Sequence, residues 1–262
     1  MGSLKLTFLG TGTSLGVPII GCPCEVCLSK DTKDKRLRTS AFIQTDKGVC
    51  LCIDSGPDFR EQMLREGIEK IDAVLITHEH RDHVAGLDDV RAYNYIQQKP
   101  MPIYGNSLAL KGLQKMFYYA FRKKLYPGSP EFELHKINPK KDKSFSIEGV
   151  EIIPIEVMHA QLPTLAYRIG KLAYVTDAKT IDSKEEEKLY GVNTLIVNAL
   201  RKEEHFSHFS LSEALALVER VKPKVTYLTH LSHLMGPYAS FEKTLPANVH
   251  LAYDGLQIEE EY

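Results

Sequence analysis

The sequence lacks a long apolar run, an excess of charge of either sign and an internal repeat. No stretch of its 262 residues approaches the roughly 20 apolar residues that a membrane-spanning helix needs. Its 33 Lys and Arg and its 34 Asp and Glu give a net charge of −1, which argues against a protein that coats nucleic acid. The first residues lack the basic and apolar regions of a signal peptide. We therefore expect a cytoplasmic protein with no membrane partner.

Short apolar segments separated by turn signals predict one α/β domain over residues 1–262. Hydrophobic residues make up 43% of the chain and charged residues 26%, and a chain of this length often folds as a single domain. Strands outnumber helices, and hairpins mix with helical crossovers, which favours two packed sheets flanked by helices (α+β). Strands are predicted over residues 4–9, 40–45, 49–53, 73–76, 152–157, 165–169, 172–175, 194–197, 225–228 and 249–252. Helices are predicted over residues 58–66, 84–97, 108–121, 182–189 and 211–221.

The segment after the strand predicted over residues 73–76 is dense in side chains that bind metal ions. It places His78, His80, Asp82 and His83 within six residues. Imidazoles this close would repel one another if protonated, and would cost desolvation free energy if buried without partners. A bound dication removes both costs, so we favour a metal site over a solvated polar loop.

Three more candidate ligands each follow a predicted strand: His159, Asp177 and His230. Side chains in such positions can converge on one edge of a sheet. Hydrolases with two metal ions hold them about 3.5–4 Å apart, which calls for roughly six to eight ligands and commonly a bridging carboxylate. The sequence therefore predicts a dinuclear site.

Five cysteines is an odd number, and three of them crowd together as Cys22, Cys24 and Cys27. In a cytosolic protein this crowding indicates metal ligation before disulfides. Three thiolates are one ligand short of a closed tetrahedral zinc site, so a distant residue should complete it. Reduced thiols in a loop are the alternative. Cys50 and Cys52 lie on one face of a strand, and we expect them to pack in the core.

Residues 77–83 match the T-H-x-H-x-D-H signature of the metallo-β-lactamase superfamily, which the chain resembles over nearly its whole length. The resemblance implies the αββα four-layer sandwich of that family, with two divalent catalytic ions, Zn or Mn, and a hydroxide between them. Asp54 matches an upstream aspartate of the family and would orient a ligand histidine. In the implied ligand set one ion takes His78, His80 and His159, the other takes Asp82, His83 and His230, and Asp177 bridges them.

Residues 10–18 and 21–27 (GTGTSLGVP and GCPCEVC) resemble the PhnP branch of the superfamily. Its members are phosphodiesterases that open a cyclic phosphate on ribose. They carry one structural zinc on three cysteines and a histidine from a T-H-x-S-H segment, which residues 229–233 supply here. The resemblance thus implies His233 as the fourth ligand beside Cys22, Cys24 and Cys27, with an idle surface residue as the alternative. It also implies a homodimer.

The resemblance implies a catalytic set of Asp82, Asp177 and a histidine that protonates the leaving alkoxide. His208 precedes the helix predicted over residues 211–221, as the general acid of the family does, and histidine suits this task near neutral pH. His205 is a nearby competitor, and either one can be an ordinary loop histidine.

A basic stretch spans residues 106–145, with nine Lys and Arg against three acids, and carries Tyr118, Tyr119 and Tyr126. Such a stretch can attract a phosphorylated substrate or stack on nucleotide bases. We favour the alternative, a solvated helix whose Tyr and Phe side chains face the core.

Together these features predict a metal-dependent phosphodiesterase that hydrolyses a cyclic or diester phosphate of a small, ribosyl-type substrate. Three alternatives stay open. They are a tRNA 3′-processing enzyme like RNase Z, a lactone or thioester hydrolase, and a metal-binding carrier protein without catalysis. RNase Z lacks the cysteine cluster and has a protruding arm, and a complete ligand set argues against the carrier.

Overall fold

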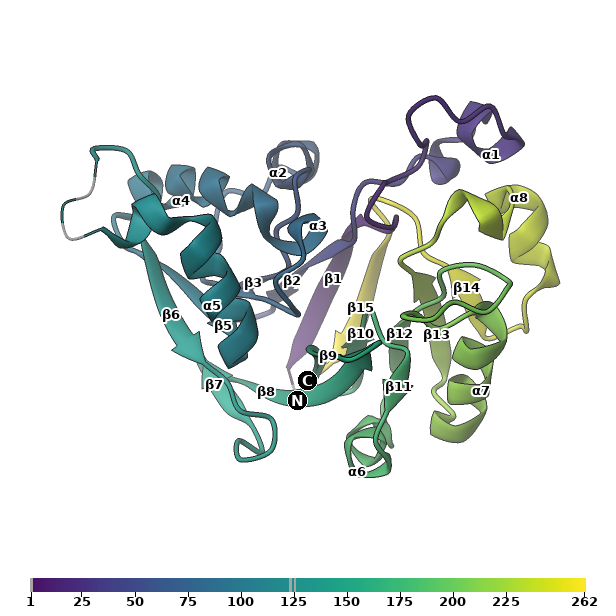
Figure 1. Cartoon of the computed structure of the whole chain (residues 1–262). Coiled ribbons are helices and arrows are strands. Elements are labelled where there is room, and N and C mark those ends of the chain that lie inside the picture. Colours follow the sequence, from purple (N-terminus) through teal and green to yellow (C-terminus); the bar gives the residue numbers. More distant parts are fainter. Residues whose placement is uncertain (1, 123, 125) are drawn as a thin grey trace.

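Two β-sheets pack face to face, and helices cover both outer faces (Figure 1). This computed structural model describes all residues except 1, 123 and 125. One apolar cluster fills the space between the sheets, and two others lie between each sheet and its helices. These layers are the αββα sandwich of the metallo-β-lactamase fold, so the predicted fold class is confirmed.

The first sheet has seven strands and is antiparallel on one side and parallel on the other. The antiparallel part joins β15 to β3, and the parallel part joins β3 to β6. The strand order is β15 (Gln257–Glu261), β1 (Ser3–Gly10), β2 (Ser40–Thr45), β3 (Cys50–Ile53), β4 (Ala73–Leu75), β5 (Met101–Gly105) and β6 (Phe132–Lys136).

The second sheet repeats this division into antiparallel and parallel halves. Strands β11 to β10 are antiparallel, β10 to β14 are parallel, and β7 (Phe145–Ile147) pairs with β8 off the main path. The order is β11 (Thr180–Ile181), β8 (Val150–His159), β9 (Leu162–Ile169), β10 (Leu172–Val175), β12 (Thr194–Asn198), β13 (Val225–Thr229) and β14 (Val249–Leu251).

The helices divide between the two sheets. Those of the first sheet are α2 (Phe59–Glu66), α3 (Arg81–Val84), α4 (Arg91–Gln97) and α5 (Ser107–Met116), and those of the second are α6 (Ser183–Glu186), α7 (Leu211–Val221) and α8 (Tyr238–Phe241). A short helix, α1 (Glu25–Leu28), lies in the loop after β1. None of the helices within the described residues is long and apolar enough to cross a membrane.

Helix α7 shows how local sequence and packing agree. Ser210 and Glu213 form a capping box at its start, in which each side chain accepts a hydrogen bond from the backbone of the other residue. Its buried face is Ala214, Leu217, Val218 and Val221, which packs on the second sheet.

All ten predicted strands are present, and the described residues form five further strands that were missed. Edge strands β6 and β15 carry alternating exposed polar residues and too few apolar ones to be recognised. Strands β7 and β11 have only three and two residues, and β5 contains Pro102, which indicates a turn.

Three predicted helices were wrong in extent. The helix over 182–189 is α-helical only over Ser183–Glu186 and continues as the 3-10 segment Glu187–Leu189. The helix over residues 84–97 is interrupted by a 3-10 segment, Ala85–Val90. The helix over 108–121 ends at Met116 and is followed by the 3-10 turn Tyr118–Phe121.

Candidate dinuclear metal centre

The candidate ligands gather at one edge of the sandwich, where strands from both sheets end. Carboxyl ends of neighbouring parallel strands meet at the same edge, so residues distant in sequence come together there. His78 follows β4, His159 ends β8, Asp177 follows β10 and His230 follows β13, and His80, Asp82 and His83 lie at the start of α3.

The seven predicted ligands form two groups, each compact enough for one ion, and His208 forms a further group with His159 and Asp177. Within each group all ligand atoms lie within 4.8 Å of one another. One group is His78, His80 and His159, and the other is Asp82, His83, Asp177 and His230. The structure therefore brings together all seven residues predicted from the sequence.

Asp177 faces both groups. Its Oδ2 atom lies 3.8 Å from His78 Nε2 and 3.4 Å from His83 Nε2, and its Oδ1 atom lies 3.1 Å from His230 Nε2. A carboxylate placed between two sets of imidazoles in this way has the geometry of a bridging ligand.

The backbone at the site is strained. Asp54, Asp177 and His230 have φ values of 61°, 53° and 55°, in the left-handed region that non-glycine residues rarely adopt. Each such residue costs about 1–3 kcal/mol and persists only where its surroundings hold it, typically at functional sites. At Asp177, the Asn198 amide holds the next residue: it accepts from Ala178 N at 2.8 Å and donates to Ala178 O at 3.0 Å.

Other protein groups occupy one nitrogen of key ligand rings and leave the other nitrogen for a metal. Asp54 Oδ2 lies 2.6 Å from His83 Nδ1, and the same carboxylate accepts from Thr77 N and Oγ1, each at 2.8 Å. His159 Nδ1 donates to the carbonyl of Ser207 at 2.8 Å. Asp54 thus has the orienting position predicted for it.

The remaining ring nitrogens fit a metal. The Nε2 atoms of His78, His83 and His230 are buried and have no hydrogen-bond partner among the described residues. Buried polar atoms without partners are costly, and a divalent cation would satisfy all three.

Electrostatics favour cations at this site. Burial lowers the pKa of His78 well below its usual value and that of His159 to about 4, so both rings are neutral at pH 7 and can bind a metal. Burial acts to lower the pKa of His83 too, but the carboxylates of Asp177 and Asp82, together with Asp54, raise it well above its usual value. Three carboxylates around one imidazole require positive charge, which two dications would supply.

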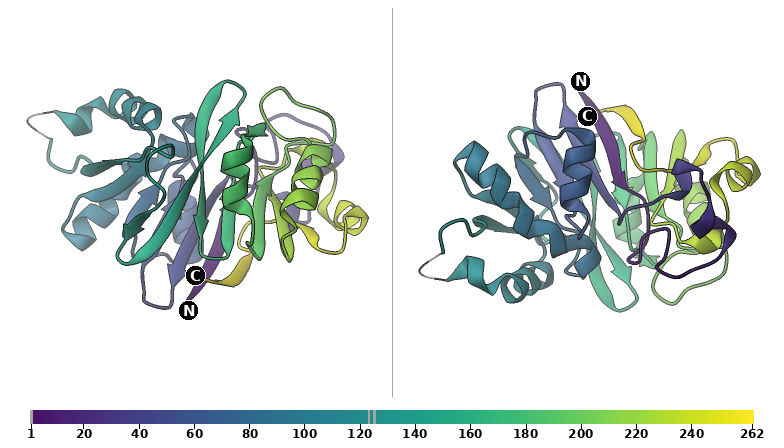
Figure 2. Two further views of the ribbon diagram at one scale, coloured as in Figure 1. Left: turned by 90° about the horizontal axis from the view of Figure 1, so that it is seen from below. Right: turned by 90° about the horizontal axis from the view of Figure 1, so that it is seen from above.

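A second cluster joins the loop after β1 to the loop after β13. These distant segments lie side by side, with α1 next to the C-terminal part of the chain (Figure 2). The Nδ1 atom of His233 lies 3.4, 3.2 and 3.6 Å from the Sγ atoms of Cys22, Cys24 and Cys27. A tetrahedral zinc with ordinary bond lengths places sulfur and nitrogen ligands about 3.6 Å apart, so the four residues fit zinc.

Hydrogen bonding and burial separate the pKa values of Cys24 and Cys27 in this cluster. The backbone N–H of Cys27 donates to Cys24 Sγ at 3.4 Å and lowers the pKa of Cys24 to about 6. Burial raises the pKa of the Cys27 thiol to about 11, even though Ile19 N donates to its sulfur at 3.3 Å. Cys50 and Cys52 are buried in the core, as expected.

Of the two candidate acids, His208 is the one at the centre. Its Nε2 atom lies 3.3 Å from Asp177 Oδ2, and its ring stacks on His230 with 4.9 Å between centroids. His205 contacts His208 from the outer side, with 3.2 Å between the two Nδ1 atoms.

Sequence patterns missed two groups that position the ligands. Ser207 acts through its backbone carbonyl, for which no sequence signal exists. Asn198 is the last residue of β12, so it could have been predicted as a polar residue at the end of a strand, as Asp177 was.

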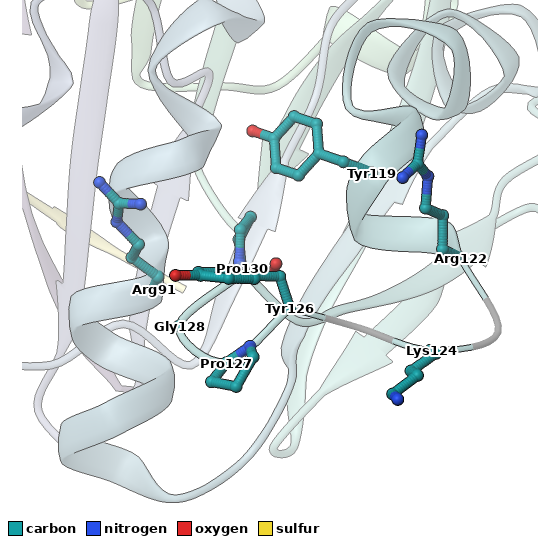
Figure 3. A pocket seen from close by; sticks show the side chains of 9 residues that line it. Arg91, Tyr119, Arg122, Lys124, Tyr126, Pro127, Gly128 and Pro130 are labelled. Atoms are coloured by element: carbon teal, nitrogen blue, oxygen red, sulfur yellow. The ribbon is translucent and has the colours of Figure 1, made fainter.

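None of the described residues of the basic stretch over residues 106–145 belongs to the candidate metal-binding groups. Its Phe117 faces the core as expected, but Tyr118 and Tyr126 are 59% and 82% exposed, so that expectation was wrong for both. Lys123 lies outside the described residues. A nearby pocket is lined by Arg91, Tyr119, Arg122, Lys124, Tyr126, Pro127, Gly128, Ser129 and Pro130, and its cations point in different directions (Figure 3).

Comparison with known proteins identifies the family. A model described as a beta-lactamase superfamily domain matches residues 51–231. With this fold and site, the protein is a metal-dependent hydrolase of the metallo-β-lactamase superfamily. The solved structure of a new diphosphatase from the PhnP family is 41% identical, covers 98% of this chain and 97% of that chain, and superposes with a TM-score of 0.91. The chain therefore belongs to the metallo-β-lactamase superfamily and, within it, to the PhnP family.

Two other proteins are also similar to the chain. An octanoyltransferase of Porphyromonas gingivalis is 40% identical over 97% of this chain, but the match covers only 51% of that protein. The chain thus spans about half the length of this relative. The short form of human tRNase Z is 18% identical with a TM-score of 0.71, over 97% of this chain and 98% of that one, which shows a shared fold alone.

Proposed function

We propose that the protein is a phosphodiesterase that hydrolyses a cyclic or diester phosphate of a small, ribosyl-type substrate. The observation that carries the proposal is the position of His208, a histidine outside the two ligand groups predicted for the metals, 3.3 Å from Asp177. An alkoxide leaving a phosphodiester is strongly basic and needs a proton, so a histidine beside the centre suits this reaction.

In this proposal the chain's own residues have separate tasks. His78, His80 and His159 would hold one divalent ion, and Asp82, His83 and His230 the other, with Asp177 between them. When bound, such ions supply a nucleophile at neutral pH and neutralise charge on the phosphoryl oxygens. His208 holds a proton at Nε2, on the side of its ring that faces Asp177.

We also propose a structural zinc on Cys22, Cys24, Cys27 and His233. Short sulfur–nitrogen distances and N–H groups directed at Cys24 and Cys27 support it. Because such a site needs reduced thiols, it also supports the proposal of a cytoplasmic protein. The homodimer implied by the PhnP resemblance is tested by the mass of the purified protein in solution.

A second candidate substrate is a diphosphate. Its support is the name of the solved relative that is 41% identical, a diphosphatase. A phosphate leaving group is less basic than an alkoxide, so His208 would matter less for this reaction.

One substrate panel separates these functions. Protein loaded with Mn or Zn is given bis-p-nitrophenyl phosphate, a 2′,3′-cyclic nucleotide, a dinucleoside diphosphate, a lactone, an octanoyl thioester and a precursor tRNA. Turnover of the cyclic nucleotide is expected, and it should disappear in Asp177→Ala. Turnover of the lactone or thioester alone would refute the phosphodiesterase, and turnover of the diphosphate alone would select the second candidate.

A further inference from the structure

The loop between β12 and α7 is closed by contacts at its ends and outer turn that do not involve its histidine rings, while Ser207 N donates to His205 Nδ1 at 3.4 Å. Backbone hydrogen bonds join Leu200 N to Phe209 O at 3.0 Å and Phe209 N to Ala178 O at 2.7 Å. On the outer side, Arg201 donates to the carbonyl of Glu204 at 2.8 Å, and Lys179 contacts the Glu204 carboxylate at 3.4 Å. These contacts hold both ends and the outer turn of the loop.

Inside this loop the ring of His208 is contacted at both nitrogens. Its Nε2 atom lies 3.3 Å from Asp177 Oδ2, while its Nδ1 atom lies 3.2 Å from His205 Nδ1 and 3.0 Å from Ser207 Oγ. The carboxylate of Asp177 accepts hydrogen bonds, so Nε2 must carry a proton to bond with it. The Nδ1 atom then accepts a hydrogen bond when the ring is neutral and donates one when the ring is charged.

His205 can serve Nδ1 of His208 in both cases. An imidazole nitrogen donates or accepts according to its tautomer, and His205 is half-buried, so its own tautomer can change by exchange with solvent. Ser207 Oγ lies 3.2 Å from His205 Nδ1, and the Ser207 carbonyl receives the Nδ1 proton of His159. One short segment therefore contacts the candidate acid and a candidate ligand together.

We propose that His205 is a positioning residue that, with Ser207, keeps the Nε2 atom of His208 directed at the metal centre. The proposal rests on the phosphodiesterase function, in which His208 protonates the leaving group. Without the His205 imidazole, Nδ1 keeps only the Ser207 hydroxyl at 3.0 Å, so the ring of His208 can turn away from Asp177 and protonation of a basic leaving group becomes slow.

The test compares two variants of similar size, His205→Leu and His205→Gln. Leucine has no polar atom, whereas the glutamine amide can donate or accept. With a 2′,3′-cyclic nucleotide, whose leaving group is an alkoxide, we expect kcat to fall about tenfold or more in His205→Leu and to recover in His205→Gln. With bis-p-nitrophenyl phosphate, whose leaving group needs no proton, both variants should stay within about twofold of the wild type.

His250→Leu is the matched control, because His250 is another half-buried histidine, whose Nδ1 atom lies 2.9 Å from the carboxylate of Glu242. It should leave both rates unchanged. Equal losses on both substrates in His205→Leu, or no loss on either, would overturn the positioning role. Failure of the wild type on both diesters would instead refute the proposed function.

NMR spectroscopy tests the positioning role even if the wild type hydrolyses neither diester. In ¹⁵N-histidine NMR spectra, the His208 ring should give one set of signals in the wild type and in His205→Gln. His205→Leu should shift or broaden these signals, and unchanged His208 signals in this variant would overturn the proposal.

Discussion

The substitution Asp54→Asn tests whether the hydrogen bond between Asp54 and His83 strengthens metal binding by His83. Asp54 is fully buried and accepts three hydrogen bonds, from Thr77 N, Thr77 Oγ1 and His83 Nδ1, at 2.6–2.8 Å. In Asp54→Asn one of the two oxygens becomes an NH₂ group. If the remaining oxygen keeps His83, the buried N–H of Thr77 loses its acceptor, which costs about 1–3 kcal/mol of stability.

The same substitution weakens the metal site. A neutral amide makes His83 a poorer ligand than a carboxylate does, and loss of such a supporting group typically lowers metal affinity about 10–100-fold. We therefore expect the ion that His83 would hold to bind about 10–100-fold more weakly. The second ion should bind as in the wild type, apart from what it loses through the shared Asp177.

The assay pairs a metal titration against a chromogenic chelator with urea unfolding in EDTA. Asp72→Asn is the control, because Asp72 is also buried and accepts from Cys50 N at 2.9 Å, but lies just before β4, at the end opposite the ligands. Both variants should lose stability without metal, and only Asp54→Asn should lose metal affinity. Wild-type affinity for both ions in folded Asp54→Asn would refute the reasoning.

Three further predictions concern the candidate metal ligands. Asp177→Ala should abolish turnover of every substrate and lower the content of catalytic metal, measured by elemental analysis; residual activity within about tenfold of the wild type would contradict a bridging role. Cys24→Ser should lower the zinc content by about one ion per chain, and unchanged zinc would refute the thiolate site. In zinc-free protein at pH 7, iodoacetamide should alkylate Cys24 before Cys27, because their pKa values are about 6 and about 11. This preference should fade as the pH falls below 6 and Cys24 becomes protonated, and equal rates at pH 7, measured by peptide mass spectrometry, would contradict it.

Most of the candidate site could be predicted because its side chains follow strands. His78, Asp177 and His230 each follow a strand of the parallel halves by one to three residues. Two of these strands, β4 and β10, are buried apolar runs that the sequence shows clearly, and β13 (VTYLT) is rich in β-branched residues. Their meeting at one edge then follows from parallel pairing. His159 is the exception, since β8 is antiparallel to its neighbours, and only its place after an apolar run marked it.

The groups that support the ligands were harder to predict. Asp54 was found by resemblance, whereas Ser207 contributes a backbone carbonyl and Asn198 holds the backbone of Ala178. Such contacts depend on how loops from different strands pack, and no periodicity in the sequence records that. The edge strands β6 and β15 were missed for a related reason: half of their residues face solvent, so pairing with a neighbour, and not an apolar pattern, makes them strands.

The cysteine cluster is linked to the segment that carries His230. His233 lies three residues after His230, and the backbone of Leu231 between them donates to Thr11 O at 2.8 Å, in the loop that leads to the cysteines. A zinc on Cys22, Cys24, Cys27 and His233 would therefore tie the loop after β1 to the short segment that presents His230. Since His230 has a left-handed backbone conformation that non-glycine residues disfavour, this tie would help to keep the strained residue in place. A structural site there would thus stabilise the geometry of the proposed catalytic one, although the two sites would share no ligand.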